Sequence, residues 1–212
     1  MGSLYVKDVL ITARKYIGYK EDPNNYNFFA ECLDGCDYFA PQKKQNVAWC
    51  AIFCDFCVMY STIPEERDDE AKKYDAQYFL YQPSYNNYSA SANMFASYFK
   101  NAGAWYKEPE VGDMIFFDRG SGISHVGIVE EISNDIITTI EGNAGDMVQR
   151  KWYDFDNPNI AGFGRPRYDG TGYPDNAIPD PEPIEKTVNI DILVDAPEDI
   201  KVNINIHRVS ND

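Results

Sequence analysis

Two residues far apart in the chain have the side chains needed for nucleophilic catalysis. Cys50 follows Trp49 within a long apolar run, and His125 is one of only two histidines in the sequence. A thiol becomes a useful nucleophile when a nearby base or a helix start favours its thiolate, and a cysteine at a helix start facing a histidine on a strand has both. We therefore interpret the chain first as a cysteine hydrolase.

Each of these residues also has a purely structural interpretation. Cys50, Cys54 and Cys57 share one helical face and could all be core thiols, and a lone histidine such as His125 is usually satisfied by the core. The place of Cys50 at a helix start favours it as the nucleophile, and we expect Cys54 and Cys57 in the core. His207 has no such context and is expected at the surface.

Hydrophobic periodicity predicts the helices that would position the cysteine. Residues 4–17 have the pattern of an amphipathic helix, and residues 91–101 repeat it. The apolar run 47–60 is too short to span a bilayer and predicts a buried central helix. Asn46 is its expected N-cap, which would put Cys50 in the first turn near the positive end of the helix.

Two polar stretches separate these helices. Residues 21–46 are rich in Asn, Asp, Pro and Gly without a sustained period, which predicts a long loop leading into the central helix. Residues 65–73 are charged, and we interpret them as a solvated surface.

Short alternating segments bounded by turn residues predict an antiparallel sheet that would carry the histidine. The expected strands are residues 114–117, 126–132, 136–140, 147–152 and 161–168. Helices followed by such a meander predict an α+β fold, with N-terminal helices packed on a central antiparallel sheet.

The composition changes after the last of these strands. Residues 169–186 are rich in Pro and Gly and predict a linker, and residues 187–212 contain two alternating apolar segments that predict a C-terminal β-hairpin. The main domain is therefore expected at residues 1–168. A lone hairpin is marginal in water, so this one would pack on the main domain, pair with another chain or begin a truncated module.

Composition excludes several classes of function. The 212 residues are 44% hydrophobic and carry a net charge of −15, which fits a folded protein and argues against binding to nucleic acid. We expect no membrane span and no secretory signal, and so a cytoplasmic location until release. The five cysteines are an odd number, which argues against a complete disulfide framework.

Four short motifs together resemble a known family. They are Trp49-Cys50-Ala51, Gly112-Asp113-Met114-Ile115-Phe116-Phe117, Ser124-His125-Val126-Gly127-Ile128-Val129 and Thr139-Ile140-Glu141-Gly142-Asn143. In this order they resemble the CHAP domain, a papain-like cysteine amidohydrolase and peptidase module related to the NlpC/P60 group. The resemblance covers roughly residues 4–168 and implies a papain-like fold.

The resemblance implies a role for each matching residue. Cys50 would be the nucleophile and His125 the general base, with Glu141 as its direct partner and Asn143 in support. The backbone N–H of Cys50 would bind the oxyanion, and Gln45 is a candidate second donor, although a surface glutamine is the alternative.

Other residues before the nucleophile are open to more than one interpretation. Tyr26 resembles a cleft-lining position of related sequences, and a packing role is equally compatible with it. No cofactor is required for the chemistry. A structural zinc ion held by Cys32, Cys36, Cys54 and Cys57, or a calcium ion at Asp34 and Asp37, is a less favoured alternative.

The implied activity is hydrolysis of an amide bond in bacterial peptidoglycan through a cysteine thioester. The enzyme would be an N-acetylmuramoyl-L-alanine amidase or a stem or cross-bridge endopeptidase, as in a bacteriolytic phage endolysin that acts at the cell wall. The alternative is a catalytically silent peptide-binding or assembly module, with the C-terminal hairpin driving homo-oligomer formation.

Overall fold

The protein is described here by a computed structural model of residues 1–62 and 66–172. The chain divides into two units, Met1–Glu182 and Pro183–Asp212, and the described residues lie in the first. Among them, helices come first and the strands follow, as the sequence predicts. No helix in this part of the chain is long and apolar enough to cross a membrane.

Five α-helices and one short 3-10 helix occur in the described residues. They are α1 Val6–Arg14, η1 Pro23–Asn25, α2 Phe28–Gly35, α3 Cys50–Met59, α4 Asp69–Phe79 and α5 Ala92–Asn101. Every residue of α3 is buried, including Asp55, so this helix lies in the core of the described domain, as its long apolar run predicts. The helix α5 begins after Ser91 and ends near Gly103, in agreement with the pattern in the sequence.

The strands form a single six-stranded antiparallel sheet. They are β1 Trp105–Tyr106, β2 Met114–Asp118, β3 Ile123–Ser133, β4 Ile136–Glu141, β5 Gln149–Asp154 and β6 Ile160–Gly164. The order across the sheet is β1-β6-β2-β3-β4-β5, so β6 returns to pair beside β2. The predicted α+β fold, with helices on an antiparallel sheet, is confirmed.

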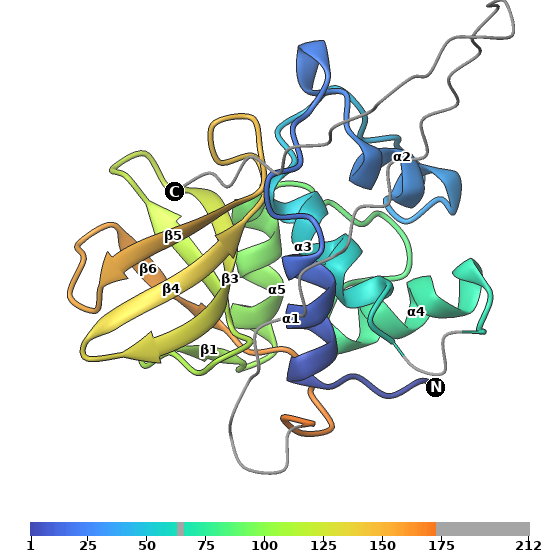
Figure 1. The fold of residues 1–212 in the computed structure, drawn as a ribbon. Coiled ribbons are helices and arrows are strands. Elements are labelled where there is room, and N and C mark those ends of the chain that lie inside the picture. Colours follow the sequence, from blue (N-terminus) through green and yellow to red (C-terminus); the bar gives the residue numbers. More distant parts are fainter. Residues whose placement is uncertain (63–65, 173–212) are drawn as a thin grey trace, which may run out of the picture. The chain divides into compact units, whose positions relative to one another are not determined.

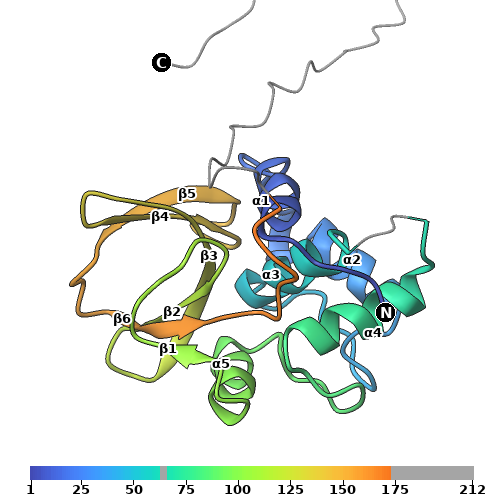
Figure 2. The same ribbon diagram turned by 90° about the horizontal axis from the view of Figure 1, so that it is seen from below.

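The helices lie on one side of the curved sheet (Figures 1 and 2). Contacts join α3 and α5 to β3, and α5 also contacts β6. The helices α1, α2 and α4 pack around α3. Because α3 touches both the sheet and the other helices, a residue at its start is held from several directions.

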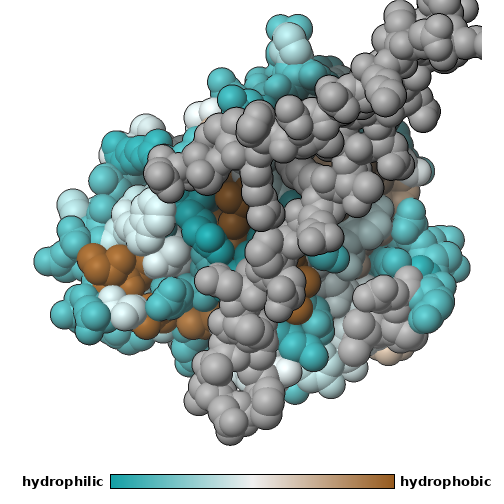
Figure 3. Space-filling model, viewed as in Figure 1, coloured by the Kyte–Doolittle hydropathy of each residue, from teal (hydrophilic) through white to brown (hydrophobic). Residues whose placement is uncertain are grey.

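Figure 3 shows the hydropathy of one face of the molecule. Its described surface is mostly teal and white, with brown only in separate patches. Isolated apolar side chains of this kind are normal on a folded protein.

The structure corrects two expectations for the segment before α3. Residues 21–46 are not a long loop, since they contain η1 and α2. Asn27 caps α2 by accepting a hydrogen bond from the backbone N–H of Ala30, and Phe29 and Leu33 bury one face of the helix. Asn46 is not the N-cap of α3. The N-cap is Trp49, and Asn46 lies three residues earlier in a left-handed backbone conformation with a φ of 63°.

The boundaries of other elements also differ from those expected. The charged stretch 65–73 enters α4, which begins after its N-cap Asp68 and buries Ala76 and Phe79 further on. The strand expected at residues 161–168 ends at Gly164, and the short β1 has too few residues to show a pattern. The hairpin, His207 and most of the linker lie outside the described residues.

Candidate active site

Cys50 is the first residue of α3, where the sequence places it. Its side chain remains 4% exposed, whereas Cys54 and Cys57 have no exposure. The preceding residue fixes this helix start: Trp49 is buried, and its indole N–H donates to the Glu21 carboxylate. The ring of Trp49 also packs against that of Phe29 at 5.3 Å between centroids.

His125 and Glu141 meet Cys50 from two neighbouring strands. His125 lies near the start of β3 and Glu141 is the last residue of β4, and the His125 Nε2–H donates to Glu141 Oε2 at 2.8 Å. The His125 ring also shares a hydrogen bond with the thiol of Cys50. Since Nε2 faces the carboxylate, Nδ1 is the ring nitrogen left for the thiol.

Cys50, His125 and Glu141 form a hydrogen-bonded line, and the charges in this line stabilise one another. Burial alone would lower the pKa of His125, but its hydrogen bonds to Cys50 and Glu141 outweigh burial and raise that pKa to about 9. Burial would raise the pKa of Glu141, yet the hydrogen bond from His125 holds it below its ordinary value. At neutral pH the line therefore holds an imidazolium between a carboxylate and a thiol, and an imidazolium favours a neighbouring thiolate.

Two glycines provide the space in which the three side chains meet. A Cβ at Gly127 on β3 would lie 2.5 Å from Cγ of Glu141. A Cβ at Gly142, directly after Glu141, would lie 2.5 Å from Cβ of Phe53 on α3. The close contact between the end of β4 and the start of α3 thus requires glycine at position 142.

Two further residues hold the Glu141 carboxylate, and the sequence analysis missed both. Thr139 donates from Oγ1 to Glu141 Oε1 at 2.6 Å, and the Tyr153 hydroxyl forms another hydrogen bond with the carboxylate. Thr139 lies two positions before Glu141 on the same face of β4, so the period of the strand could have revealed it. Tyr153 comes from β5 and has no sequence signal of this kind.

The remaining predicted site residues are Asn143, Gln45 and Tyr26. Asn143 is half-buried in the turn after β4, with a φ of 56°. Gln45 is paired with the backbone of Asn27: its Nε2 donates to the Asn27 carbonyl at 2.8 Å and its Oε1 accepts from the Asn27 N–H at 3.0 Å. Tyr26 is the residue before this contact and is 42% exposed.

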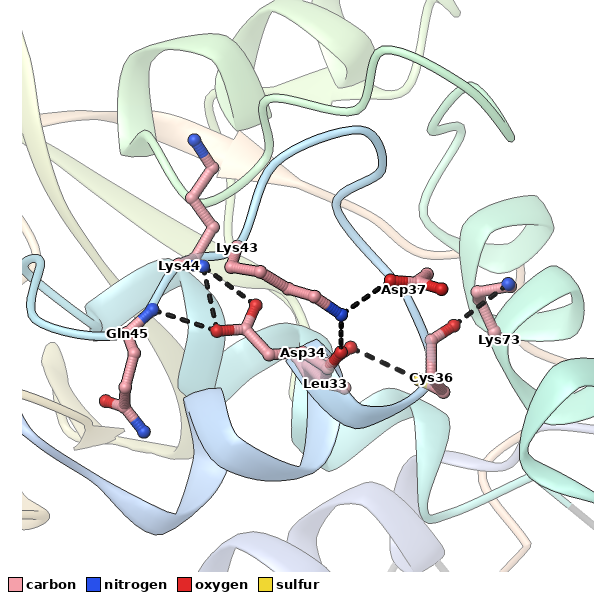
Figure 4. A network of polar contacts seen from close by, with 8 residues as sticks. All are labelled: Leu33, Asp34, Cys36, Asp37, Lys43, Lys44, Gln45 and Lys73. Carbon is pink, nitrogen blue, oxygen red and sulfur yellow. Dashed lines mark hydrogen bonds and ion pairs between the residues drawn. The ribbon is translucent and has the colours of Figure 1, made fainter.

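The loop between α2 and α3 is held by its own charged groups (Figure 4). Asp34 accepts hydrogen bonds from the backbone N–H groups of Lys44 and Gln45 at 2.8 to 2.9 Å. The Lys43 ammonium pairs with Asp37 at 2.5 Å and also donates to the Asp34 carbonyl. The carboxylates of Asp34 and Asp37, which we weighed as calcium ligands, are thus bonded within the loop.

The cysteines weighed as zinc ligands are free thiols. Cys54 and Cys57 are buried in α3, and Cys32 and Cys36 are half-buried at α2. Within residues 1–62 and 66–172, no group of three or more Cys, His, Asp or Glu side chains is arranged to hold a metal ion.

A cysteine at a helix start, paired with a histidine that a carboxylate orients, is an arrangement that can transfer acyl groups through a thioester. The comparison with protein families agrees with the motifs: residues 42–143 match the model of the CHAP domain, the family that the four motifs resemble. The matched region includes Cys50, His125 and Glu141.

Two solved structures are also similar to this chain. They are the crystal structure of Ly7917, with a TM-score of 0.46, and the crystal structure of Ly7917 with the hydrolyzing product of MDP, with a TM-score of 0.47. Each is 18% identical, and the similarity covers 76% of this chain but 62% of that chain. A search of curated proteins found no match.

Proposed function

We propose that the protein is a cysteine peptidoglycan hydrolase that cleaves an amide bond through a thioester on Cys50. The observation that carries this proposal is the hydrogen-bonded line of Cys50, His125 and Glu141 inside a CHAP domain. A complex of the similar Ly7917 contains the hydrolyzing product of MDP, which fits a wall substrate.

The first half of the reaction forms the thioester. The Cys50 thiolate attacks the carbonyl carbon of the amide, and the oxygen gains a negative charge that the backbone N–H of Cys50 can bind, since the first N–H groups of a helix have no intrahelical acceptor. When the C–N bond breaks, the His125 imidazolium gives its proton to the leaving amine. Glu141 keeps the ring oriented throughout.

The second half releases the acid. A water molecule gives a proton to the now neutral His125 and attacks the thioester carbonyl, and the C–S bond breaks to return the thiolate. Gln45 is a candidate second oxyanion donor, because only one of the two N–H bonds of its amide is used on Asn27. Asn143 in the adjacent turn would support the Glu141 end of the line.

The bond cleaved is either the lactyl-peptide amide or an amide within the stem or cross-bridge peptide. The first case is an amidase and the second an endopeptidase, and both use the same residues. We further propose, on the family resemblance alone, that the protein is a phage endolysin that acts on the bacterial wall after release from the cytoplasm.

Purified cell walls test the proposal. Cys50→Ala and His125→Ala should abolish the release of new amino groups while leaving the thermal unfolding temperature close to that of the unaltered protein. Cys36→Ser is the matched control, since this half-buried thiol lies outside the proposed line. Mass spectrometry of the digest would identify the bond. Unchanged turnover in Cys50→Ala would reject the thioester on Cys50, and no hydrolysis by the unaltered protein would leave the peptide-binding or assembly module.

A further inference from the structure

An open pocket lies between the ends of α4 and α5, in a different part of the helical region from the start of α3. Its volume is about 660 Å³. None of the residues proposed for catalysis lines it. Its wall instead comes from α4, the segment that follows α4, the end of α5 and Arg167.

Tyrosine rings make up much of this wall. They are Tyr74, Tyr78, Tyr81 and Tyr98. Tyr74 and Tyr78 are 47% and 43% exposed, so part of each ring remains accessible beside Lys73, which lies over the Tyr74 ring, and Arg167, which lies over the Tyr78 ring. An aromatic ring offers a flat apolar face together with a polar hydroxyl, a combination that suits ligands with both apolar and hydroxyl-bearing surfaces.

Arg167 is held rigidly within this group of tyrosines. Its guanidinium carbon lies 4.3 Å from the centroid of the Tyr78 ring and 4.0 Å from that of Tyr81, and its Nη1 donates to the Tyr78 carbonyl at 2.8 Å. Within residues 1–62 and 66–172, no carboxylate forms an ion pair with Arg167. A stacked guanidinium with free N–H groups is suited to binding a carboxylate through two hydrogen bonds.

Two buried amides, Gln77 and Gln82, complete the pocket. Gln77 is 2% exposed, its Nε2 donates to the Tyr38 carbonyl, and its buried Oε1 has no hydrogen-bond partner among the described residues. The Gln82 side chain is held by a hydrogen bond that its Nε2 donates to the Asp55 carboxylate at 2.5 Å. An unpaired buried acceptor can take a hydrogen bond from any hydroxyl group that reaches it.

The charge of the pocket contrasts with that of the chain. The net charge of the chain is −15, whereas the pocket lining has Arg167 and no Asp or Glu. An anionic ligand is therefore attracted here more than to most of the surface.

From these observations we infer that the pocket is a binding site for an acidic saccharide, a chain of sugar rings that bears carboxylate groups. Sugar rings stack on the tyrosines, a hydroxyl group donates to Gln77 Oε1, and Arg167 binds a carboxylate. The choice of a saccharide from the cell wall rests on the proposed function. The site would hold the wall polymer while Cys50 acts elsewhere on it.

Binding can be measured without catalysis in the full chain with Cys50→Ala. The probes are peptide-free glycan strands of peptidoglycan, whose lactyl groups end in carboxylates, and a hyaluronan hexasaccharide, whose carboxylates belong to its sugar rings. A neutral N-acetylglucosamine tetramer is the third probe. We expect NMR shifts around residues 74–84, 98–102 and 167 with at least one acidic probe, and the comparison of the two identifies the source of the carboxylate.

Variants in the Cys50→Ala background test the assigned contacts. Tyr78→Ala should weaken binding about two- to tenfold through lost stacking. Arg167→Lys should weaken it about tenfold, because lysine keeps the charge but loses the planar pair of donors. Tyr85→Ala is the matched control, since Tyr85 is 63% exposed and does not line the pocket.

Each outcome decides a separate point. If neither acidic probe shifts the pocket residues, the site is overturned, even if Cys50-dependent wall hydrolysis is observed. If the neutral tetramer binds as tightly as the acidic probes, the role of Arg167 is overturned. If an acidic probe binds at the pocket but Cys50→Ala does not reduce wall hydrolysis, the proposed function fails and the saccharide site remains.

Discussion

The His125 side chain connects the chemistry of the site to its stability. The pKa of this residue is raised from 6.5 to about 9 in the folded protein, so folding favours its protonated form. The resulting stabilisation is complete below the ordinary pKa and is lost as the pH rises through about 9. The same protonation state is needed for the proposed reaction, so activity and site stability should decline together in alkaline solution.

The pH dependence of wall hydrolysis tests this connection. We expect kcat/KM to fall as the pH rises above about 9, because deprotonation of His125 removes the proton for the leaving amine. Glu141→Gln should move this fall to lower pH, because it removes a carboxylate that raises the pKa of His125, and should lower kcat roughly 10²- to 10⁴-fold. An unchanged alkaline limb in the variant would contradict the assigned partnership.

The reactivity of the five thiols should also differ sharply. We expect iodoacetamide at neutral pH to modify Cys50 first, because His125 provides an adjacent imidazolium. Burial raises the pKa of the other four thiols, which are Cys32, Cys36, Cys54 and Cys57. Peptide mass spectrometry over time would show the order, and His125→Ala should slow labelling of Cys50 alone. Earlier modification of Cys32, whose pKa is about 11, would refute this ordering.

At the scale of elements, the contact between β4 and α3 decides whether the site assembles. Gly142→Ala would place a Cβ 2.5 Å from Phe53 and 2.9 Å from the Trp49 ring, so the strand end must move away from the helix. We expect a loss of roughly 1–3 kcal/mol in the free energy of unfolding, together with reduced hydrolysis.

Denaturant unfolding and wall digestion would check this prediction. Gly35→Ala is the control, since a Cβ at Gly35 has nothing within 4 Å and should change stability by less than about 0.5 kcal/mol. Equal activity and stability in Gly142→Ala and Gly35→Ala would show that the close approach does not matter.

A buried ion cluster ties α1 to the sheet. Glu130 on β3 is 3% exposed and accepts from Arg14 on α1 at 2.6 Å and from Arg150 on β5 at 2.7 Å. Burial would raise the pKa of Glu130, but its bonds to Arg150 and Arg14 lower it, so the carboxylate is ionised at neutral pH.

Removing this carboxylate takes one ion-pair partner from Arg150 and from the buried Arg14. We expect Glu130→Ala to reduce the free energy of unfolding by roughly 3–5 kcal/mol. Glu131→Ala, at the adjacent exposed position, should change it by less than about 0.5 kcal/mol. Similar unfolding midpoints for the two variants would mean that the cluster contributes little.

The sequence predicted the elements with strong apolar periodicity and missed those without it. The helices α1, α3 and α5 follow their predicted patterns, and so do the strands β2, β3, β4 and β5. The helix α2 was missed because the Asn- and Asp-rich sequence around it is typical of loops. Asn27, a residue type that often caps helices, was the one local signal for its start. The start of α4 was missed because its first turns are charged and its buried residues come later.

At the scale of the whole molecule, the described domain extends slightly beyond the boundary expected at residue 168. The backbone N–H of Asp169 donates to the Leu4 carbonyl, and Val6 and Lys7 donate to the carbonyls of Gly170 and Thr171. A truncation that keeps these bonds should therefore end at Gly172.

Such a truncation tests the homo-oligomer proposed for the C-terminal segment. Its alternating valines and isoleucines predict a hairpin, and a lone hairpin gains stability by pairing with another chain. We expect light scattering to give a mass above one chain for the full sequence and the monomer mass for residues 1–172. Monomer masses for both proteins would remove the oligomer from consideration.

The sequence by itself determined the types and order of the reactive residues and the local elements that carry them. Cys50 at a helix start, His125 on a strand and Glu141 at a strand end all follow from short-range patterns, which depend on neighbouring residues alone. Only the tertiary structure decided that they meet, that Tyr153 holds the carboxylate, and that Tyr78 and Tyr81 stack on Arg167. These contacts join residues that are distant in the sequence. They depend on how the sheet packs against the helices, so they produce no local periodic pattern from which they could be predicted.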